Sequence, residues 1–291
     1  MIGIVSVLYK SDAVLPDFFE SLARQTYQDF LLILVDNDAN ETTQSIIEML
    51  NIQYSKIRIE YIDSNANIGV AAGNNVGIQR AQHLNCQQTL LSNNDIVLVE
   101  NDILDKMIYL NLSENKKLIT PKILYYDTKK IWMAGGYYSK WRSLGVHYGN
   151  HAEADDSRFN FSREVTYAPT CFMFIDTEVF DKIGLMDEKY FVYVDDTDFI
   201  YRCVQNNILI WYDHTKTILH KVSSSTGGDD TPFYIYYSNR NKIYFVKKHY
   251  DLIFKTIAFF HIFITRTINY FRYTKSQKDS LVNAVKDGLK M

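Results

Sequence analysis

The first third of the chain alternates between short apolar runs and segments with helical periodicity, and this alternation limits the folds open to it. Apolar residues fill positions 2–8 and 31–35 almost without interruption, as in strands buried on both faces of a parallel sheet. Between them, apolar residues recur at steps of three and four, which predicts a helix with Pro16 in its first turn and Ser11 or Asp12 as its cap. The alternation continues with a helix over 43–50, a strand over 57–62, a helix over 71–83 and a strand over 89–91. We therefore predict an α/β fold with a mostly parallel, Rossmann-like central sheet and helices on both faces.

Composition excludes several classes of protein. The 291 residues are 47% hydrophobic, which is enough for one large or two modest packed domains. The net charge of −3 provides no basic field for a nucleic-acid backbone, so we expect no nucleic-acid partner. The three cysteines, Cys86, Cys171 and Cys203, form no C-x-x-C pair, and the N-terminus lacks the features of a secretion signal. These features favour a reducing, cytoplasmic location.

The C-terminal residues 249–291 form a separate segment, which we expect to be an amphipathic helical extension. Aromatic and branched residues dominate positions 249–275, but Lys255, Arg266 and Arg272 interrupt them, so we expect no membrane-spanning helix. Two interpretations remain open. The segment could lie along an anionic membrane surface, or it could pack on its own domain or on a second protomer of a homodimer.

Polar side chains gather directly after two of the predicted strands. Asp36 and Asn37 follow the second strand, and the motif Asn93-Asn94-Asp95 follows the fourth. Between them, residues 65–77 are rich in small residues whose backbone could approach a ligand closely before a helix begins. Asn and Asp are also ordinary turn residues, so neither cluster alone is sufficient to predict a ligand site. Together they indicate one ligand crevice at the carboxyl edge of the sheet.

A second dense cluster of acids lies at Asp195, Asp196 and Asp198. Neighbouring carboxylates repel one another, which raises a pKa and is one way to tune a general base. The alternative is structural: Asp195 or Asp196 caps a helix, and Asp198 pairs with Arg202 one turn later. For Asp198 we favour the structural role. His220, just after an apolar strand, could face the same crevice.

Residues 111–165 are less regular, and we interpret them as strands and acceptor-side loops. His147 and His151 lie here. No second metal ligand stands at a suitable spacing from either, so we interpret both as solvated loop residues.

Taken in order, these motifs resemble the family 2 glycosyltransferases, and within them the bacterial branch that builds O-antigen, capsule and rhamnose-containing polysaccharides. The resemblance covers residues 1 to about 248 and rests on segments 5–10, 35–37, 67–77, 93–95, 184–191 and 195–198. It implies a GT-A fold, a nucleotide-sugar donor, a divalent cation, Mn²⁺ or Mg²⁺, and inversion at the anomeric carbon. It also implies a catalytic domain over 1–248, with a nucleotide-binding half over 1–110 and an acceptor-side half over 111–248.

The resemblance also implies roles for individual residues. The nucleotide-binding residues are Asp36, Asn37, Asn67, Gly69, Asn74, Asn75, Asn94 and Asp95. Asp95 is the principal metal ligand, with His220 and Asn93 beside it. The D-x-D motif of the family reads Asn93-Asn94-Asp95 here, so an amide replaces one carboxylate and the protein charge on the cation is lower. Thr170-Cys171 is a further departure, near the donor sugar.

The implied reaction is a single displacement. Asp196 removes the proton of an acceptor hydroxyl, and Asp195 orients it. The donor is a dTDP- or UDP-sugar, and the acceptor is a glycan or a lipid-linked saccharide at the cytoplasmic face of the membrane, in surface-polysaccharide synthesis. A nucleotidyltransferase and a non-catalytic nucleotide-sugar-binding module are the alternatives.

Overall fold

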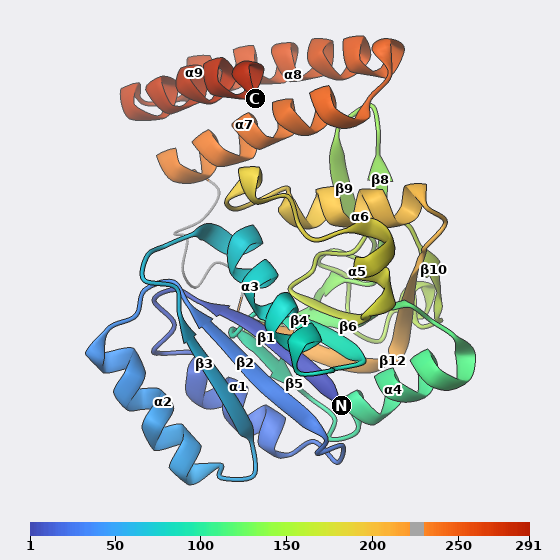
Figure 1. Ribbon diagram of the computed structural model, residues 1–291. Coiled ribbons are helices and arrows are strands. Elements are labelled where there is room, and N and C mark those ends of the chain that lie inside the picture. Colours follow the sequence, from blue (N-terminus) through green and yellow to red (C-terminus); the bar gives the residue numbers. More distant parts are fainter. Residues whose placement is uncertain (222–229) are drawn as a thin grey trace.

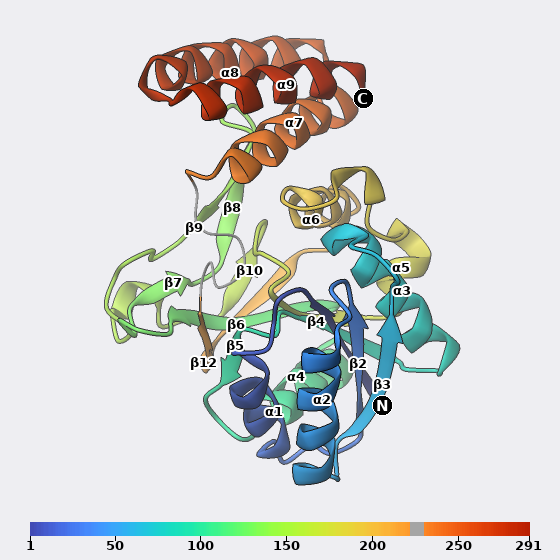
Figure 2. The same cartoon turned by 90° about the vertical axis from the view of Figure 1, so that its left-hand side faces the viewer.

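The computed structural model describes residues 1–221 and 230–291, and it confirms the α/β fold class. The first elements are β1 (Ile2–Leu8), α1 (Leu15–Ala23), β2 (Phe30–Asp36), α2 (Glu41–Gln53), β3 (Arg58–Asp63), α3 (Gly69–His83) and β4 (Gln88–Ser92). The four strands are parallel neighbours in the order β3-β2-β1-β4. Helices α1 and α2 lie on one side of these strands and α3 on the other (Figure 1, Figure 2). Their carboxyl ends share one edge, where open α/β sheets bind ligands.

The start of α1 differs from the sequence prediction. Neither Ser11 nor Asp12 caps this helix, so that prediction is wrong: the N-cap is Val14, without a side-chain hydrogen bond. Pro16 does lie in the first turn, as expected. The carboxylate of Asp12 instead accepts a hydrogen bond from Thr43 Oγ1 at 2.7 Å, and it therefore links α1 to the first turn of α2.

Beyond β4 the sheet becomes mixed. Its further strands are β5 (Ile96–Leu98), β6 (Leu118–Tyr125), β7 (Ile131–Met133), β10 (Arg163–Val165), β11 (Phe172–Asp176) and β12 (Ile210–His220). β11 runs antiparallel to both β4 and β6, whereas β12 runs parallel to β6. The helices of this half are α4 (Ile103–Glu114), α5 (Glu178–Ile183) and α6 (Asp195–Gln205). Parallel pairing therefore dominates where strand and helix alternate, and it ends where strands follow one another directly.

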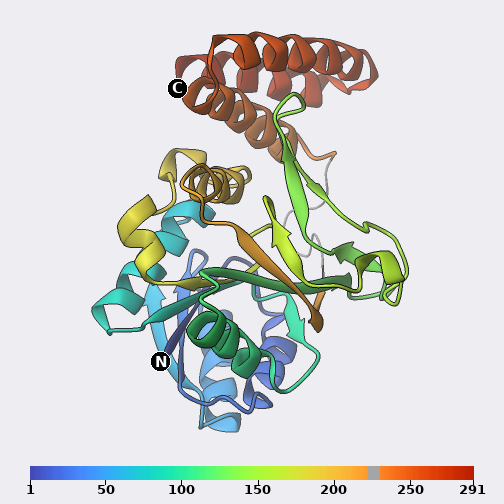
Figure 3. The ribbon, with the colours of Figure 1, turned by 90° about the vertical axis from the view of Figure 1, so that its right-hand side faces the viewer.

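A separate hairpin connects the sheet to the C-terminal helices. It consists of β8 (Gly136–Ser139) and β9 (Leu144–His147), and it extends from the sheet toward those helices (Figure 3). The hydroxyl groups of Tyr138 and Tyr250 are 2.8 Å apart, and Tyr250 also donates a hydrogen bond to the carbonyl oxygen of Lys140 at 2.8 Å. These contacts fix the helical layer over the second half of the sheet.

Three helices form the C-terminal layer: α7 (Pro232–His249), α8 (Leu252–Arg272) and α9 (Lys275–Lys290) (Figure 1). Helices α8 and α9 lie in the segment 249–291 that we expect to be helical, whereas α7 precedes it. α9 packs on α7, where Tyr236 donates a hydrogen bond to Asp287 at 2.9 Å, and where a Cβ at Gly288 would lie 2.7 Å from the carbonyl oxygen of Arg240. Of α8, only Ala258 and Ile262 are buried. By length and composition α8 could cross a membrane, so the expectation that no helix spans one stays a prediction. The domain boundary at 248/249 also stays a prediction.

The three cysteines are buried and free, as expected for a chain without a disulfide framework.

Candidate active site

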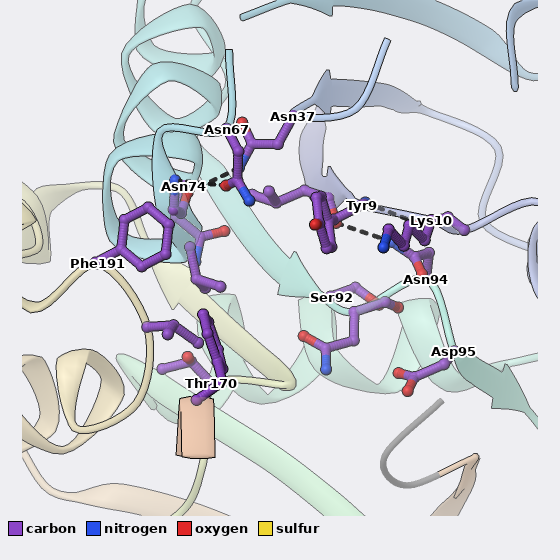
Figure 4. Close-up of a pocket in the computed structure, with 17 residues that line it drawn as sticks. Tyr9, Lys10, Asn37, Asn67, Asn74, Ser92, Asn94, Asp95, Thr170 and Phe191 are labelled. Carbon is purple, nitrogen blue, oxygen red and sulfur yellow. Dashed lines mark hydrogen bonds between the residues drawn. The ribbon is translucent and has the colours of Figure 1, made fainter. Parts of the chain in front are cut away.

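A cavity of about 300 Å³ opens at the carboxyl ends of β1, β2 and β4 (Figure 4). Each of these strands contributes polar side chains from the residues that follow it: Lys10 after β1, Asn37 after β2, and Asn94 and Asp95 after β4. The strands are buried and parallel, so the residues that follow them converge on one edge. The crevice that the sequence predicts is therefore present.

The start of α3 forms one wall of this cavity through a tight backbone turn. Asn67 Oδ1 accepts a hydrogen bond from the Gly69 amide at 3.1 Å, and Asn37 Nδ2 donates one to the Gly69 carbonyl oxygen at 3.0 Å. Gly69 has a φ of +86°, and a Cβ here would lie 2.5 Å from both the ring and the carbonyl oxygen of Phe191. Only glycine fits this position without displacing the aromatic ring that lines the cavity.

Six of the eight predicted nucleotide-binding residues line the cavity: Asn37, Asn67, Gly69, Asn74, Asn94 and Asp95. Asp36 and Asn75 lie behind it. Asp36 is buried and accepts hydrogen bonds from Tyr61 Oη and the Asp38 amide, both at 2.9 Å, and burial raises its pKa. Asn75 bonds to both backbone groups of Met186 at 2.9 Å, so it connects α3 to the segment after α5. These two side chains position the wall of the cavity.

The three predicted metal ligands lie close together: Asp95 and Asn93 line the cavity and the larger hollow that adjoins it, and His220 lines that larger hollow. His220 is the last residue of β12, and its Nε2 lies 3.3 Å from Asp95 Oδ1. Its ring packs edge-on against Trp132, and its Nδ1 has no hydrogen-bond partner among the described residues. A carboxylate and an imidazole at this separation fit two ligands of one divalent cation. In the described parts of the chain, no third His, Cys, Asp or Glu joins them.

A second, larger hollow of about 780 Å³ adjoins the first, and Asp95 and Asn93 line both. Asp195 and Asp196, the first two residues of α6, line the second hollow. Neither caps the helix, because the N-cap is Val194 in the left-handed region; the capping alternative is therefore wrong. Asp196 Oδ1 accepts a hydrogen bond from the Thr197 amide at 2.6 Å.

The electrostatics of this acid pair suit proton transfer. Burial raises the pKa of both carboxyl groups, and for Asp195 the charge of Asp196 raises it further. Asp195 is 4% exposed, whereas Asp196 is partly exposed to the hollow. Hydrogen bonds from Thr197 and Tyr167 oppose the rise at Asp196. Asp196 is therefore the more accessible carboxylate, with a pKa closer to neutrality than that of an ordinary aspartate.

Asp198 takes the structural role that we favour from the sequence. Burial alone would raise its pKa, but hydrogen bonds from His249 and Lys248 and the charge of Arg202 hold this pKa well below the ordinary range. Arg202 Nε lies 2.8 Å from Asp198 Oδ2, while Lys248 Nζ and His249 Nε2 lie 2.8 and 2.6 Å from Oδ1. Asp198 therefore fastens α6 to the end of α7.

The two histidines that we interpret as solvated loop residues differ. His151 is exposed and stacks on Tyr125, with the ring centroids 4.9 Å apart. His147 belongs to β9, is partly buried and lines the larger hollow, so the interpretation is wrong for this residue. Burial lowers its pKa, so it is neutral near pH 7 and can exchange hydrogen bonds with a sugar.

Asn241, which stabilises the loop before α6, is not identified by the sequence analysis. The backbone of Tyr193 and Val194 adopts positive φ there, at +63° and +66°. Asn241 of α7 is fully buried, and its Nδ2 donates to the carbonyl oxygens of Tyr190, Val192 and Tyr193 at 2.7–2.9 Å. This asparagine stabilises a strained loop, and the loop positions Asp195 and Asp196 at the larger hollow. Asn241 is distant from Asp195 and Asp196 along the chain, so no local sequence motif connects it to them.

The fold is that of the GT-A glycosyltransferases. A family model described as glycosyl transferase family 2 matches residues 4–184, more than half of the chain, so the chain belongs to this family. The chain is 25% identical to the low-salt glycan biosynthesis hexosyltransferase Agl10 of Haloferax volcanii over 83% of its length and 74% of that protein. It is 21% identical to the dTDP-rhamnosyl transferase RfbF of Shigella flexneri over 77% of its length and 73% of that protein.

Solved structures agree on the fold. S. aureus TarS 1–349 in complex with UDP superposes with a TM-score of 0.65 at 16% identity, over 99% of this chain and 80% of that one. The mannosyltransferase PcManGT of Pyrobaculum calidifontis, in complex with GDP-Man and Mn²⁺, gives a TM-score of 0.59 at 11% identity over 98% and 73% of the two chains. The protein is thus a glycosyltransferase whose fold neighbours hold nucleotides and Mn²⁺.

Proposed function

We propose that this glycosyltransferase moves a sugar from a dTDP- or UDP-sugar to a hydroxyl group of a glycan or lipid-linked acceptor, with inversion, in bacterial surface-polysaccharide synthesis. The observation that carries the proposal is the pair of adjoining hollows, with Asp95 at their junction and the acid pair in the larger one. A nucleotide in the smaller hollow would direct its sugar toward Asp195 and Asp196. UDP in TarS and the dTDP-rhamnosyl activity named for RfbF support the choice of nucleotide.

The mechanism follows from where charge moves during transfer. Asp196 accepts the proton of the acceptor hydroxyl as this oxygen attacks the anomeric carbon from the face opposite the diphosphate. Asp195 lies beside it and orients it, and the pKa of Asp195 is itself raised by burial and by the charge of Asp196. No covalent glycosyl-enzyme is needed, so the product is inverted. Asp95, His220 and Asn93 would hold a divalent cation, Mn²⁺ or Mg²⁺, which supplies positive charge to the leaving diphosphate when it is bound.

The alternatives receive less support. A nucleotidyltransferase would use several cations to grip a triphosphate, but among the described residues only Lys10 brings a cation to the smaller hollow. A non-catalytic module would have no use for a buried acid pair with raised pKa values.

Nucleotide binding and turnover test the proposal. Thermal unfolding with UDP, dTDP and GDP, each with and without Mn²⁺, should show one nucleotide that raises Tm more with the metal. The matching nucleotide sugar should then be turned over, and NMR of the product should show the inverted anomer. A retained anomer would refute the mechanism, and the absence of any nucleotide effect would refute the function.

We also propose that α8 lies on an anionic membrane surface. Its exposed apolar side chains include Ile253, Phe260, Phe263 and Phe271, which are 66–79% exposed. Exposed apolar surfaces of this kind commonly mark sites that bind a membrane or another protein. Lys255, Arg272 and Lys275 provide cations for anionic headgroups. The competing occupant is a second copy of the chain.

Flotation with phosphatidylglycerol vesicles separates these occupants. A truncation at Lys248 would also remove α9 from α7, so point substitutions are the better test. Phe260→Ser with Phe263→Ser should abolish flotation, whereas Leu112→Ser, an equally exposed apolar residue on α4, should leave it unchanged. Wild type that forms a dimer and does not float would refute the membrane proposal.

A further inference from the structure

The larger hollow contains a group of cations at the end formed by α7 and α8. Lys242 of α7 and Arg266 of α8 both line it. Within residues 1–221 and 230–291, neither forms an ion pair or a hydrogen bond, and Arg266 Nε is a buried donor without a partner. Unpaired cations that are largely removed from water destabilise a fold, so an anion that binds between them would compensate.

Helical spacing directs these cations and several polar groups to the same place. On α7, Ile235, Asn239 and Lys242 lie at steps of three and four and share one face. On α8, Arg266 and Asn269 lie three residues apart, and Tyr273 is the C-cap residue that follows the helix; all six residues line the hollow. The cations therefore belong to a continuous surface that could contact a sugar as well as an anion.

The positive charges near Lys242 and Arg266 favour an anion at this part of the hollow. Burial, together with the charges of Arg266 and Arg142, lowers the pKa of Lys242 to about 8. Burial likewise lowers the pKa of Arg266. Asp195 and Asp196 line the same hollow, so one acceptor could place a hydroxyl at the acids and a negative group at the cations.

We propose that Lys242 and Arg266 bind an oxyanion, a phosphate or carboxylate group, carried by the sugar acceptor. The inference rests on the proposed function, because it takes the larger hollow as the acceptor side. A guanidinium binds either oxyanion through two parallel hydrogen bonds, and an ammonium adds a point charge. The pair would thereby select charged acceptors and set their orientation relative to Asp196.

Titration calorimetry with phenyl phosphate, glucuronate and glucose tests this proposal on the full chain. EDTA in the buffer removes any metal that could bind phosphate in the nucleotide cavity. Wild type should bind one or both anions and not glucose. Lys242→Met and Arg266→Gln should each weaken that binding about tenfold or more, as expected for the loss of a charge-assisted contact. The matched control, Arg24→Gln, removes an exposed arginine at the end of α1, outside the hollow, and should bind like wild type.

Three results would overturn the proposal. The first is equal anion affinity in all four proteins, and the second is no anion binding by wild type. The third is a lower Tm in both variants without ligand, because cations held for an anion should destabilise the empty fold. Failure of the proposed function would appear differently, as no binding of any nucleoside diphosphate in the Tm panel, since the anion titration uses no nucleotide.

Discussion

Replacing Asp196 with Asn removes the proposed base and changes little else. The amide keeps the size of the side chain, and its oxygen can still accept the 2.6 Å hydrogen bond from the Thr197 amide. It cannot take a proton from the acceptor. Loss of a general base costs about 10²–10⁴ in rate, which corresponds to about 2.7–5.5 kcal/mol of barrier. We expect turnover to fall by this amount, with nucleotide affinity nearly unchanged.

The same substitution should stabilise the folded protein at neutral and higher pH. Burial raises the pKa of Asp196 in the folded state above its unfolded value, so the folded state binds more protons. Stability is therefore lost as pH rises from the unfolded pKa through the folded one, and the amide avoids this loss. Each unit of pKa difference between the folded and unfolded states changes the free energy of unfolding by about 1.4 kcal/mol. For a chain of this length this corresponds to about 2–3 °C in Tm. The variant should gain most near pH 8 and least near pH 4.

The assay is release of the nucleoside diphosphate from the donor, measured as kcat/KM against pH. The acid limb of wild type should lie clearly above the pKa of an ordinary aspartate, because the base must be ionised. Asp195→Asn is the matched control and should retain more activity than Asp196→Asn. If Asp196→Asn kept half of wild-type turnover while Asp195→Asn lost it, the base would be Asp195. Retention of activity by both variants would refute the mechanism.

Three further predictions follow from the geometry. Asp95→Ala should abolish Mn²⁺-dependent donor binding, whereas Asn93→Ala should weaken it less, because an amide is the poorer ligand; full activity in excess EDTA would contradict both. Gly69→Ala should weaken nucleotide binding and lower the free energy of unfolding by about 1–3 kcal/mol more than Gly184→Ala, because both glycines have positive φ but only the first would clash; equal losses in urea denaturation would contradict this. Asp198→Asn should lower the free energy of unfolding by about 3–5 kcal/mol, as expected when one partner of a buried ion-pair network is removed. For the same reason wild type should lose stability as pH falls below about 4 toward the depressed pKa of Asp198, and a pH-independent urea midpoint would contradict this.

The features that the sequence predicts well are those encoded by neighbours along the chain. Buried parallel strands appear as unbroken apolar runs, and their carboxyl ends locate the polar clusters that form the cavity. Residue type alone could not distinguish an asparagine that lines the cavity from one that supports it. Asn74 and Asn75 are adjacent on α3, yet only Asn74 lines the cavity, whereas Asn75 bonds to both backbone groups of Met186.

The features that the sequence misses depend on distant segments. Asn241 supports the loop before α6 from a helix that begins more than thirty residues later, and Lys242 lines the larger hollow from the same helix. The capping prediction at Ser11 or Asp12 fails for a related reason. The carboxylate of Asp12 accepts a hydrogen bond from the hydroxyl of Thr43 on α2 and does not cap α1. The residues near Asp12 in the sequence do not indicate that contact.

The acidic motif shows how one stretch of sequence takes two electrostatic roles. Successive residues of a helix turn by about 100°, so Asp198 points about 200° away from Asp196. Asp195 and Asp196 face the hollow, where few cations offset burial and their pKa values rise. Asp198 faces Lys248 and His249 at the end of α7, and these two residues together with Arg202 of α6 keep it ionised despite complete burial. The ionised acid therefore anchors the helix, and the anchored helix holds the other two at the larger hollow, where their raised pKa values suit the proposed base catalysis.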